Sequence, residues 1–157
     1  MRVGSRAVRV KRFITSVCLC SGLLVVASVS TFANQTLQYN YTPDPRRLSQ
    51  FQEIIPSLSV EKPPEIAAID LNEDGIREFV VRANDCDGNT GVTCEHIIIG
   101  EVSKGYIVLG KLNGTRVLLG QDYTNGVRNL LLFSNPVNDF DYDVYVWGAK
   151  QAQYVLK

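Results

Sequence analysis

Residues 65–82 read EIAAIDLNEDGIREFVVR, two short apolar segments joined by a polar loop. The apolar segments are rich in residues that strands favour, and the Asn, Asp and Gly between them are typical of a tight connection. We therefore expect a strand–loop–strand unit here, and a β domain that runs from residue 65 to residue 157.

Strand-like segments continue to the end of the chain, separated by turn signals. Lys104-Gly105 and Asn113-Gly114 stand between apolar runs, as hairpin turns do, and Asn125-Gly126 and Asn135-Pro136 mark further turns. Short connections favour antiparallel meander sheets, arranged like a propeller blade or a sandwich. The predicted strands cover residues 65–70, 76–82, 94–102, 105–110, 115–119, 127–134, 142–147 and 151–156.

Two kinds of strand pattern are present. Residues 97–99 and 130–133 are continuous apolar runs, which favour central strands covered on both faces. Residues 142–147 alternate, so that Tyr145 and Trp147 share one face of a strand with Asp143.

Residues 34–64 form a polar lead-in with one helix signal. Asp44 can cap a helix that starts at Pro45, and Pro56 ends or kinks it. The apolar residues recur at helical spacing: Leu48, Phe51, Ile54, Ile55 and Leu58. The predicted fold is therefore mainly β with one short N-terminal helix.

Residues 1–33 have the pattern of a cleaved signal peptide. Five basic residues precede an apolar run over residues 13–32, and Thr31-Phe32-Ala33 offers a small-residue cleavage site. We expect a mature protein that begins near Asn34 and is periplasmic or secreted. The alternative is an uncleaved anchor, which would be the chain's one link to a membrane.

Removing that segment makes the chain acidic. Residues 1–33 hold five of the 16 Lys and Arg and none of the 16 Asp and Glu, which leaves the remainder near −5. An acidic domain does not attract phosphate backbones, so nucleic acid is excluded as an expected partner. Cys86 and Cys94 remain as a pair, and in an oxidising compartment they predict a disulfide.

The loop at residues 70–78 has the spacing of a calcium site. Oxygen-bearing side chains occupy its first, third, fifth and ninth positions, and Gly75 lies at the sixth, where calcium loops turn sharply. The predicted ligands are the side chains of Asp70, Asn72, Asp74 and Glu78 and the backbone carbonyl of Ile76. Two alternatives stay open, namely magnesium or another ion, and a turn that needs no ion.

The loop resembles those of integrin-α-type FG-GAP repeats, which have the pattern Asp-x-Asn-x-Asp-Gly-x-x-Asp/Glu. It departs from an EF-hand, because Val81 stands at the twelfth position and strand-like sequence flanks it. The resemblance implies a calcium loop between two strands of a blade, and it covers about residues 65–82. Only one copy is present, so the chain cannot form a full propeller. More loosely, residues 65–157 resemble small exported bacterial proteins that carry one such loop and a cysteine-bridged hairpin.

Other chemistry-bearing residues give weaker signals. His96, the only histidine, is expected to be an ordinary strand residue. Asp139, Asp141 and Asp143 are expected to form a solvated loop, with a second cation site or a patch for a basic partner as the alternative. The C-terminal aromatics favour either sheet packing or a binding face: Tyr142, Tyr145, Trp147 and Tyr154.

These observations favour an exported, non-enzymatic binding domain, stabilised by one calcium ion and one disulfide. Its expected partner is an extracytoplasmic protein, as for an inhibitor or immunity protein, or a cell-envelope polymer. The alternatives are a small envelope hydrolase that uses paired carboxylates and a structural accessory subunit of an envelope assembly.

Overall fold

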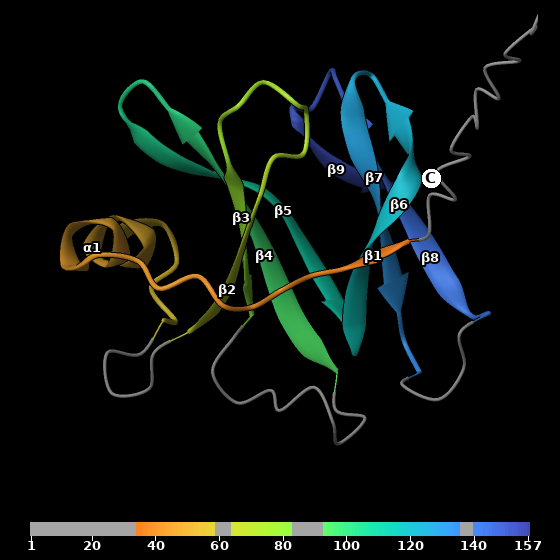
Figure 1. Ribbon diagram of the computed structural model, residues 1–157, viewed down its shortest axis with the longest axis horizontal. Coiled ribbons are helices and arrows are strands. Elements are labelled where there is room, and N and C mark those ends of the chain that lie inside the picture. Colours follow the sequence, from red (N-terminus) through yellow and green to blue (C-terminus); the bar gives the residue numbers. More distant parts are fainter. Residues whose placement is uncertain (1–33, 59–63, 83–92, 136–139) are drawn as a thin grey trace, which may run out of the picture. The chain divides into compact units, whose positions relative to one another are not determined.

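The computed structural model describes residues 34–58, 64–82, 93–135 and 140–157. Within these ranges the chain forms one short helix and two antiparallel sheets (Figure 1). The elements are β1 (Gln35–Thr36), α1 (Pro45–Ile54), β2 (Glu65–Ile69), β3 (Glu78–Arg82), β4 (Cys94–Val102), β5 (Gly105–Gly114), β6 (Arg116–Thr124), β7 (Val127–Phe133), β8 (Tyr142–Gly148) and β9 (Gln153–Leu156). The mainly β prediction is confirmed. None of the described helical segments is long and apolar enough to cross a bilayer.

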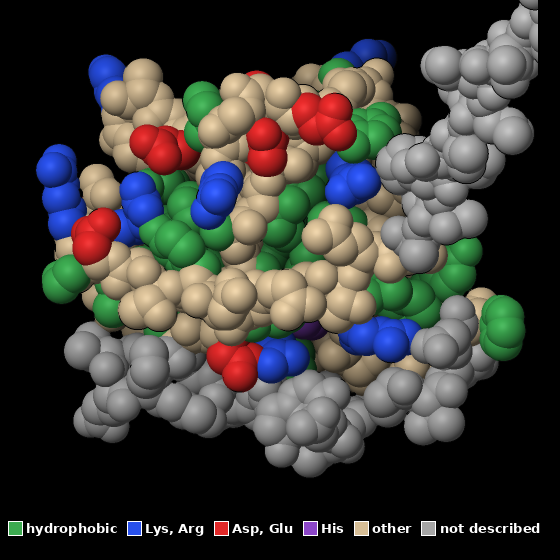
Figure 2. Space-filling model, in the orientation of Figure 1, with side chains coloured by type: hydrophobic (Ala, Val, Ile, Leu, Met, Phe, Trp, Pro, Cys, Tyr) green, Lys and Arg blue, Asp and Glu red, His purple; other side chains and the backbone are tan. Residues whose placement is uncertain are grey.

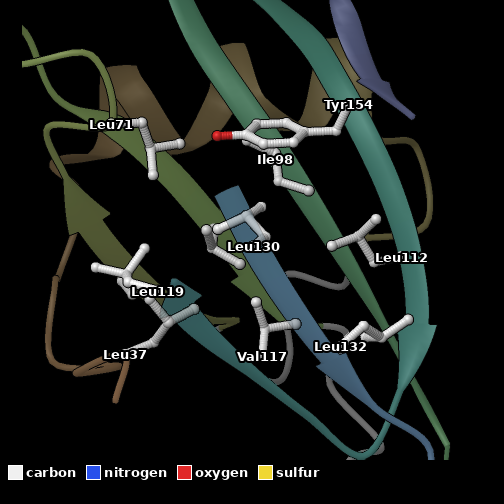
Figure 3. Packing of buried hydrophobic residues seen from close by; sticks show 11 residues of the cluster. Leu37, Leu71, Ile98, Leu112, Val117, Leu119, Leu130, Leu132 and Tyr154 are labelled. Carbon is white, nitrogen blue, oxygen red and sulfur yellow. The ribbon is translucent and has the colours of Figure 1, made fainter. Parts of the chain in front are cut away.

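The strands divide into a four-stranded sheet, in the order β2-β3-β4-β5, and a five-stranded sheet, in the order β1-β6-β7-β8-β9. Buried side chains from both sheets share one core, including Ile98 and Leu112 from the first sheet and Leu130 and Leu132 from the second (Figure 3). The two sheets therefore pack face to face, as in a sandwich.

The helix covers the other face of the four-stranded sheet. Asp44 caps α1 by accepting a hydrogen bond from the backbone N–H of Arg47 at 2.9 Å, as its position before Pro45 predicts. Phe51, which is fully buried, contacts Phe79 of β3 with ring centroids 5.2 Å apart. A second core therefore lies between α1 and this sheet.

The continuous apolar run in β4 serves both cores. Ile98 belongs to the core between the sheets, whereas Ile97 and Ile99 belong to the core under the helix. All three are at most 1% exposed. This confirms that the run is a central strand covered on both faces, because neighbouring side chains of a strand point to opposite sides.

The predicted hairpin at Lys104-Gly105 and the predicted turn at Asn125-Gly126 are both present. Val102 pairs with Gly105 across the β4–β5 turn, and Thr124 pairs with Val127 across the β6–β7 turn. At the second turn Asn125 and Gly126 have φ angles of 53° and 79°, the left-handed values that an Asn-Gly hairpin needs.

The predicted hairpin at Asn113-Gly114 is wrong. Strand β5 continues to Gly114, and β6 begins two residues later in the other sheet, so the chain crosses between sheets at this point. A Cβ on Gly114 would lie 2.5 Å from Leu132 Cδ1 and 2.7 Å from the Phe133 carbonyl oxygen. Glycine is needed here for a close approach of two strands rather than for a turn.

The lead-in also contributes to the fold. Residues of β1 pair with β6 at the edge of the five-stranded sheet, and Leu37 is 5% exposed in the core between the sheets. The polar composition of residues 34–43 does not predict this strand, because a two-residue edge pairing needs no apolar pattern of its own.

Candidate functional site

The predicted calcium loop joins β2 to β3. Ile69 and Glu78, at its two ends, pair with each other as the last step of the β2–β3 ladder. Glu73 and Gly75 have φ angles of 60° and 85°, so the loop turns through two left-handed residues. Three further connections lie at the same end of the described fold: the β4–β5, β6–β7 and β8–β9 turns, at the top of Figure 1.

Hydrogen bonds within the loop bring the first three predicted ligands together. The Asp70 carboxylate accepts from the backbone N–H of Asp74 at 3.2 Å and of Gly75 at 2.9 Å. Asn72 Oδ1 also accepts from the N–H of Asp74 at 3.2 Å, and Asn72 Nδ2 donates to Asp74 Oδ2 at 2.8 Å. The spacing read from the sequence therefore places Asp70, Asn72 and Asp74 around one turn.

The other two predicted ligands are used differently. Glu78 is 9% exposed, and its Oε2 accepts from the Leu71 backbone N–H at 2.8 Å. The Ile76 backbone N–H donates to Asp74 Oδ1 at 2.7 Å, and the Ile76 side chain is 53% exposed. Among the described residues, no three His, Cys, Asp or Glu side chains form a group arranged to hold a metal ion.

The loop carboxylates nevertheless affect one another. Burial raises the pKa of Glu78 above its ordinary value, and the nearby negative charges of Asp74 and Asp70 raise it further. Within the described ranges, no Lys or Arg forms an ion pair with any of these three groups. Each carboxylate has about four lone-pair sites, so the hydrogen bonds within the loop leave acceptor capacity for a cation.

The loop is attached to the five-stranded sheet, which the sequence does not predict. The Leu71 carbonyl accepts from the Arg128 N–H of β7 at 2.8 Å, and the Arg128 carbonyl accepts from the Tyr154 hydroxyl at 2.8 Å. Tyr123 also donates to Glu73. Burial first, and then the charge of Glu78, raises the pKa of the Tyr154 hydroxyl. The loop between β2 and β3 of the four-stranded sheet is thus hydrogen-bonded to the five-stranded sheet, and it links the two sheets at this end of the fold.

A cavity of about 190 Å³ lies between the loop, the β4–β5 hairpin and the C-terminal strands. Its inner wall is apolar and includes Leu71, Leu109 and Trp147, whereas Asp74 and Glu78 bring carboxylates to it. The T-shaped pair of Trp147 and Tyr154, with ring centroids 5.7 Å apart, forms one side. Two of the C-terminal aromatics therefore serve both sheet packing and a cavity wall.

Exposed apolar side chains surround this cavity. Ile76, Val102 and Ile107 are 53%, 40% and 43% exposed, and all three line it. We call this surface, with the half-buried Trp147, the loop face. It combines residues from four separate segments, so no single sequence motif could indicate it.

His96 has a structural role in β4. It is 1% exposed, its Nδ1 lies 3.0 Å from the Tyr39 hydroxyl, and its Nε2 lies 3.3 Å from the Gly114 carbonyl. Because a carbonyl can only accept, Nε2 carries the proton and Nδ1 accepts from Tyr39. Burial is the main cause that lowers the pKa of His96 to about 4, so the ring is neutral. The expectation of an ordinary strand histidine is thus consistent with its surroundings.

The remaining predicted site residues are described only in part. Cys94 is buried at the start of β4, and Cys86 lies outside the described residues, so the disulfide between them stays a prediction. Asp141 and Asp143 are exposed, and Asp139 lies outside the described residues. No second cation site is assembled from the two described aspartates.

Comparison with protein-family models, with curated proteins and with solved structures finds no match to this chain. The resemblance of residues 65–82 to FG-GAP loops therefore rests on the loop sequence alone.

Proposed function

We propose that this protein is an exported, non-enzymatic binding domain whose loop face engages an extracytoplasmic protein or a cell-envelope component, with a calcium ion in the β2–β3 loop. The observation that carries the proposal is the position of the loop. It connects the two sheets at the end where exposed apolar side chains surround a cavity. An ion that stiffens the loop would therefore stiffen the binding face.

The calcium part of the proposal is supported by the closeness of Asp70, Asp74 and Glu78. Burial is the main cause of the raised pKa of Glu78, and the negative charges of Asp74 and Asp70 raise it further. A bound cation offsets these negative charges, and calcium accepts carboxylate, amide and carbonyl oxygens in flexible geometry. Asp74 and Glu78 each keep lone pairs beyond their present hydrogen bonds, so the ion can bind without displacing those bonds. Magnesium is disfavoured, because it keeps several waters and demands near-ideal octahedral geometry.

The calcium proposal is tested by thermal unfolding with calcium and with chelator. A ligand that binds only the native state, at a hundredfold excess over its Kd, stabilises by about 2.7 kcal/mol. For a domain of this size the Tm should rise by roughly 10 °C. Asp74→Ala should remove most of the rise, whereas Asp141→Ala, at an exposed position outside the loop, should keep it. A Tm that calcium and chelator leave unchanged would exclude the ion and leave a turn closed by its own hydrogen bonds.

The binding part is supported by the size and chemistry of the loop face. A cavity of about 190 Å³ is smaller than the roughly 300–1,000 Å³ typical of small-molecule sites, so it suits one side chain of a larger partner. Capture from envelope extract should yield a partner, and Ile107→Asp should abolish the binding of that partner. Leu156→Asp is the matched control, because Leu156 is also exposed but does not line the cavity. Equal capture by both variants would exclude the loop face.

One observation favours a hydrolase as the second candidate. Glu78, whose pKa is raised mainly by burial, and Glu101 line the same cavity, and glycoside hydrolysis uses a pair of carboxyl groups. The small cavity opposes this function, because it lacks room for a sugar ring with its neighbours. The protein should then turn over cell-wall polymers, and Glu78→Gln and Glu101→Gln should each abolish that turnover. This result would establish the hydrolase and overturn the binding proposal.

The proposed location outside the cytoplasm depends on removal of residues 1–33 and on the disulfide. It suits a domain in which the buried Cys94 would be oxidised rather than kept as a thiol.

A further inference from the structure

A second, larger cavity lies on the helix side of the β2–β3 loop. It measures about 560 Å³, and its walls come from the lead-in, α1, the loop and the β4–β5 hairpin. The lining includes Tyr41, Arg47, Arg77, Phe79, Glu101 and Ser103. In Figure 2, both basic and acidic side chains lie over this side of the molecule, with hydrophobic side chains visible between them. The volume falls within the range of small-molecule sites.

Arg47, in the first turn of α1, is held from several sides. Its Nε donates to the Tyr106 hydroxyl at 2.8 Å, and its Nη1 donates to the Tyr41 hydroxyl. The guanidinium carbon lies 5.6 Å from the Phe79 ring centroid and 5.9 Å from that of Tyr41, within reach of cation–π attraction. Its orientation is therefore fixed before any ligand arrives.

The charge of Arg47 interacts with the Asp44 carboxylate but does not form an ion pair with it. Among the described residues it forms no ion pair, and the two tyrosine hydroxyls are neutral acceptors. A guanidinium has five N–H donors in a planar fork, so the two bonds to tyrosine leave donors available toward the cavity. A half-buried, pre-oriented arginine of this kind is suited to bidentate recognition of a planar anion.

The other charges of the cavity favour an anion with a single negative charge. Arg77 lies on the loop wall and Glu101 on the hairpin wall, so the lining carries two positive groups and one negative group. Exposed faces of Ile76 and Val102, 53% and 40% exposed, supply apolar surface beside them. A ligand that matches this lining has one carboxylate next to an apolar group.

We propose that this cavity binds a carboxylate attached to an apolar group, held by the guanidinium fork of Arg47, with the apolar part against Phe79, Ile76 and Val102. Such a group occurs in free organic acids and at the chain end of a peptide with an apolar last residue. The contacts to Arg47 and Phe79 do not depend on the calcium ion, since neither residue belongs to the loop, whereas Ile76 does belong to it. The cavity would give the proposed binding domain a second contact point beside its loop face.

The test is a titration of isotope-labelled protein with sodium hexanoate, followed by NMR at constant ionic strength and in the presence of chelator. Saturable shifts are expected for α1, residues 75–77 and Ser103, with a Kd of order 1 mM for so small a ligand. Hexanamide, which has the same apolar chain and no charge, should cause no saturable shift. Absence of saturation with hexanoate, or equal binding of the amide, would overturn the proposal.

Substitutions separate recognition from folding. Arg47→Lys keeps the charge but loses the fork, and should weaken binding about tenfold. Because that change also disturbs packing on Phe79, Glu101→Gln is the decisive variant. It removes the opposing carboxylate at an exposed position and should strengthen binding about two- to threefold. Its matched control is Glu95→Gln, since Glu95 pairs with Lys111 and does not line the cavity. Weaker or unchanged binding by Glu101→Gln would contradict the proposed placement of the carboxylate.

Two further ligands identify the source and the anion. A short peptide that ends in leucine with a free carboxylate is compared with the same peptide amidated at its end. Tighter binding than hexanoate that amidation abolishes would support a peptide chain end, and binding equal to hexanoate would support a free acid. Inorganic phosphate that binds more tightly than either would overturn the carboxylate assignment.

Discussion

Gly114→Ala perturbs the point where the chain passes from one sheet to the other. The new Cβ would lie 2.5 Å from Leu132 Cδ1 and 2.7 Å from the Phe133 carbonyl oxygen, both far closer than carbon atoms tolerate. The φ of Gly114 is outside the left-handed region, so backbone strain does not contribute. The cost is therefore steric.

The size of this steric cost depends on which of the two neighbouring groups can move away from the new Cβ. The Leu132 side chain can change rotamer, but the Phe133 carbonyl oxygen is backbone, and it accepts hydrogen bonds from Thr115 N at 2.7 Å and Thr115 Oγ1 at 2.9 Å. Overpacking typically costs about 1–3 kcal/mol. Loss or lengthening of these hydrogen bonds adds roughly 1 kcal/mol. We expect Gly114→Ala to lower the free energy of unfolding by about 2–4 kcal/mol.

The assay is equilibrium unfolding in urea, with Gly126→Ala as the matched control. Gly126 has a φ of 79° and nothing within 4 Å of an added Cβ, so its substitution should cost only the roughly 1–2 kcal/mol of left-handed strain. In the background of Leu132→Ala, the Gly114→Ala cost should shrink, whereas the Gly126→Ala cost should not. A Gly114→Ala protein within about 0.5 kcal/mol of wild type, or additive costs with Leu132→Ala, would refute the crossover argument.

Three further outcomes are expected. The folded-state pKa of His96, about 4, lies below its ordinary value, so the unfolded chain binds more protons and stability is lost as pH falls through about 6.5 toward 4, by on the order of 3 kcal/mol. His96→Gln should flatten that part of the stability curve, and an unchanged slope would contradict the argument. Non-reducing peptide mapping should recover Cys86 joined to Cys94, and two alkylated thiols in exported protein would exclude the bond. Intact mass should place the mature N-terminus near Asn34, unless residues 13–32 are retained as an anchor.

Much of the loop could be predicted from the sequence because its geometry is local. The oxygen-bearing side chains at Asp70, Asn72 and Asp74 need only the turn at Gly75 to meet, and the hydrogen bonds among them span two to five residues. The use of Glu78 could not be predicted. Its burial, its bond to Leu71 N and its raised pKa depend on neighbours that pack over it.

The same division holds for the proposed binding surfaces. Arg47 carries no sequence signal beyond its place in a helix, and its partners Tyr41, Phe79 and Tyr106 come from three other segments. The loop face likewise joins residues that lie up to about seventy positions apart in the chain. Contacts between segments far apart in the chain have no fixed sequence spacing, so no motif can indicate them.

The sequence by itself determined the local elements of this protein. The capped helix, the run of isoleucines in β4 and the Asn-Gly hairpin after β6 follow from residue preferences that act over a few positions. Only the tertiary structure decided which strands share a sheet. At Gly114 the sequence pattern Asn-Gly is compatible with a hairpin, yet the chain crosses between sheets there. The physical reason is that β4 is buried on both faces, by the helix α1 on one side and by the five-stranded sheet on the other. These layers form only when segments far apart in the sequence pack together.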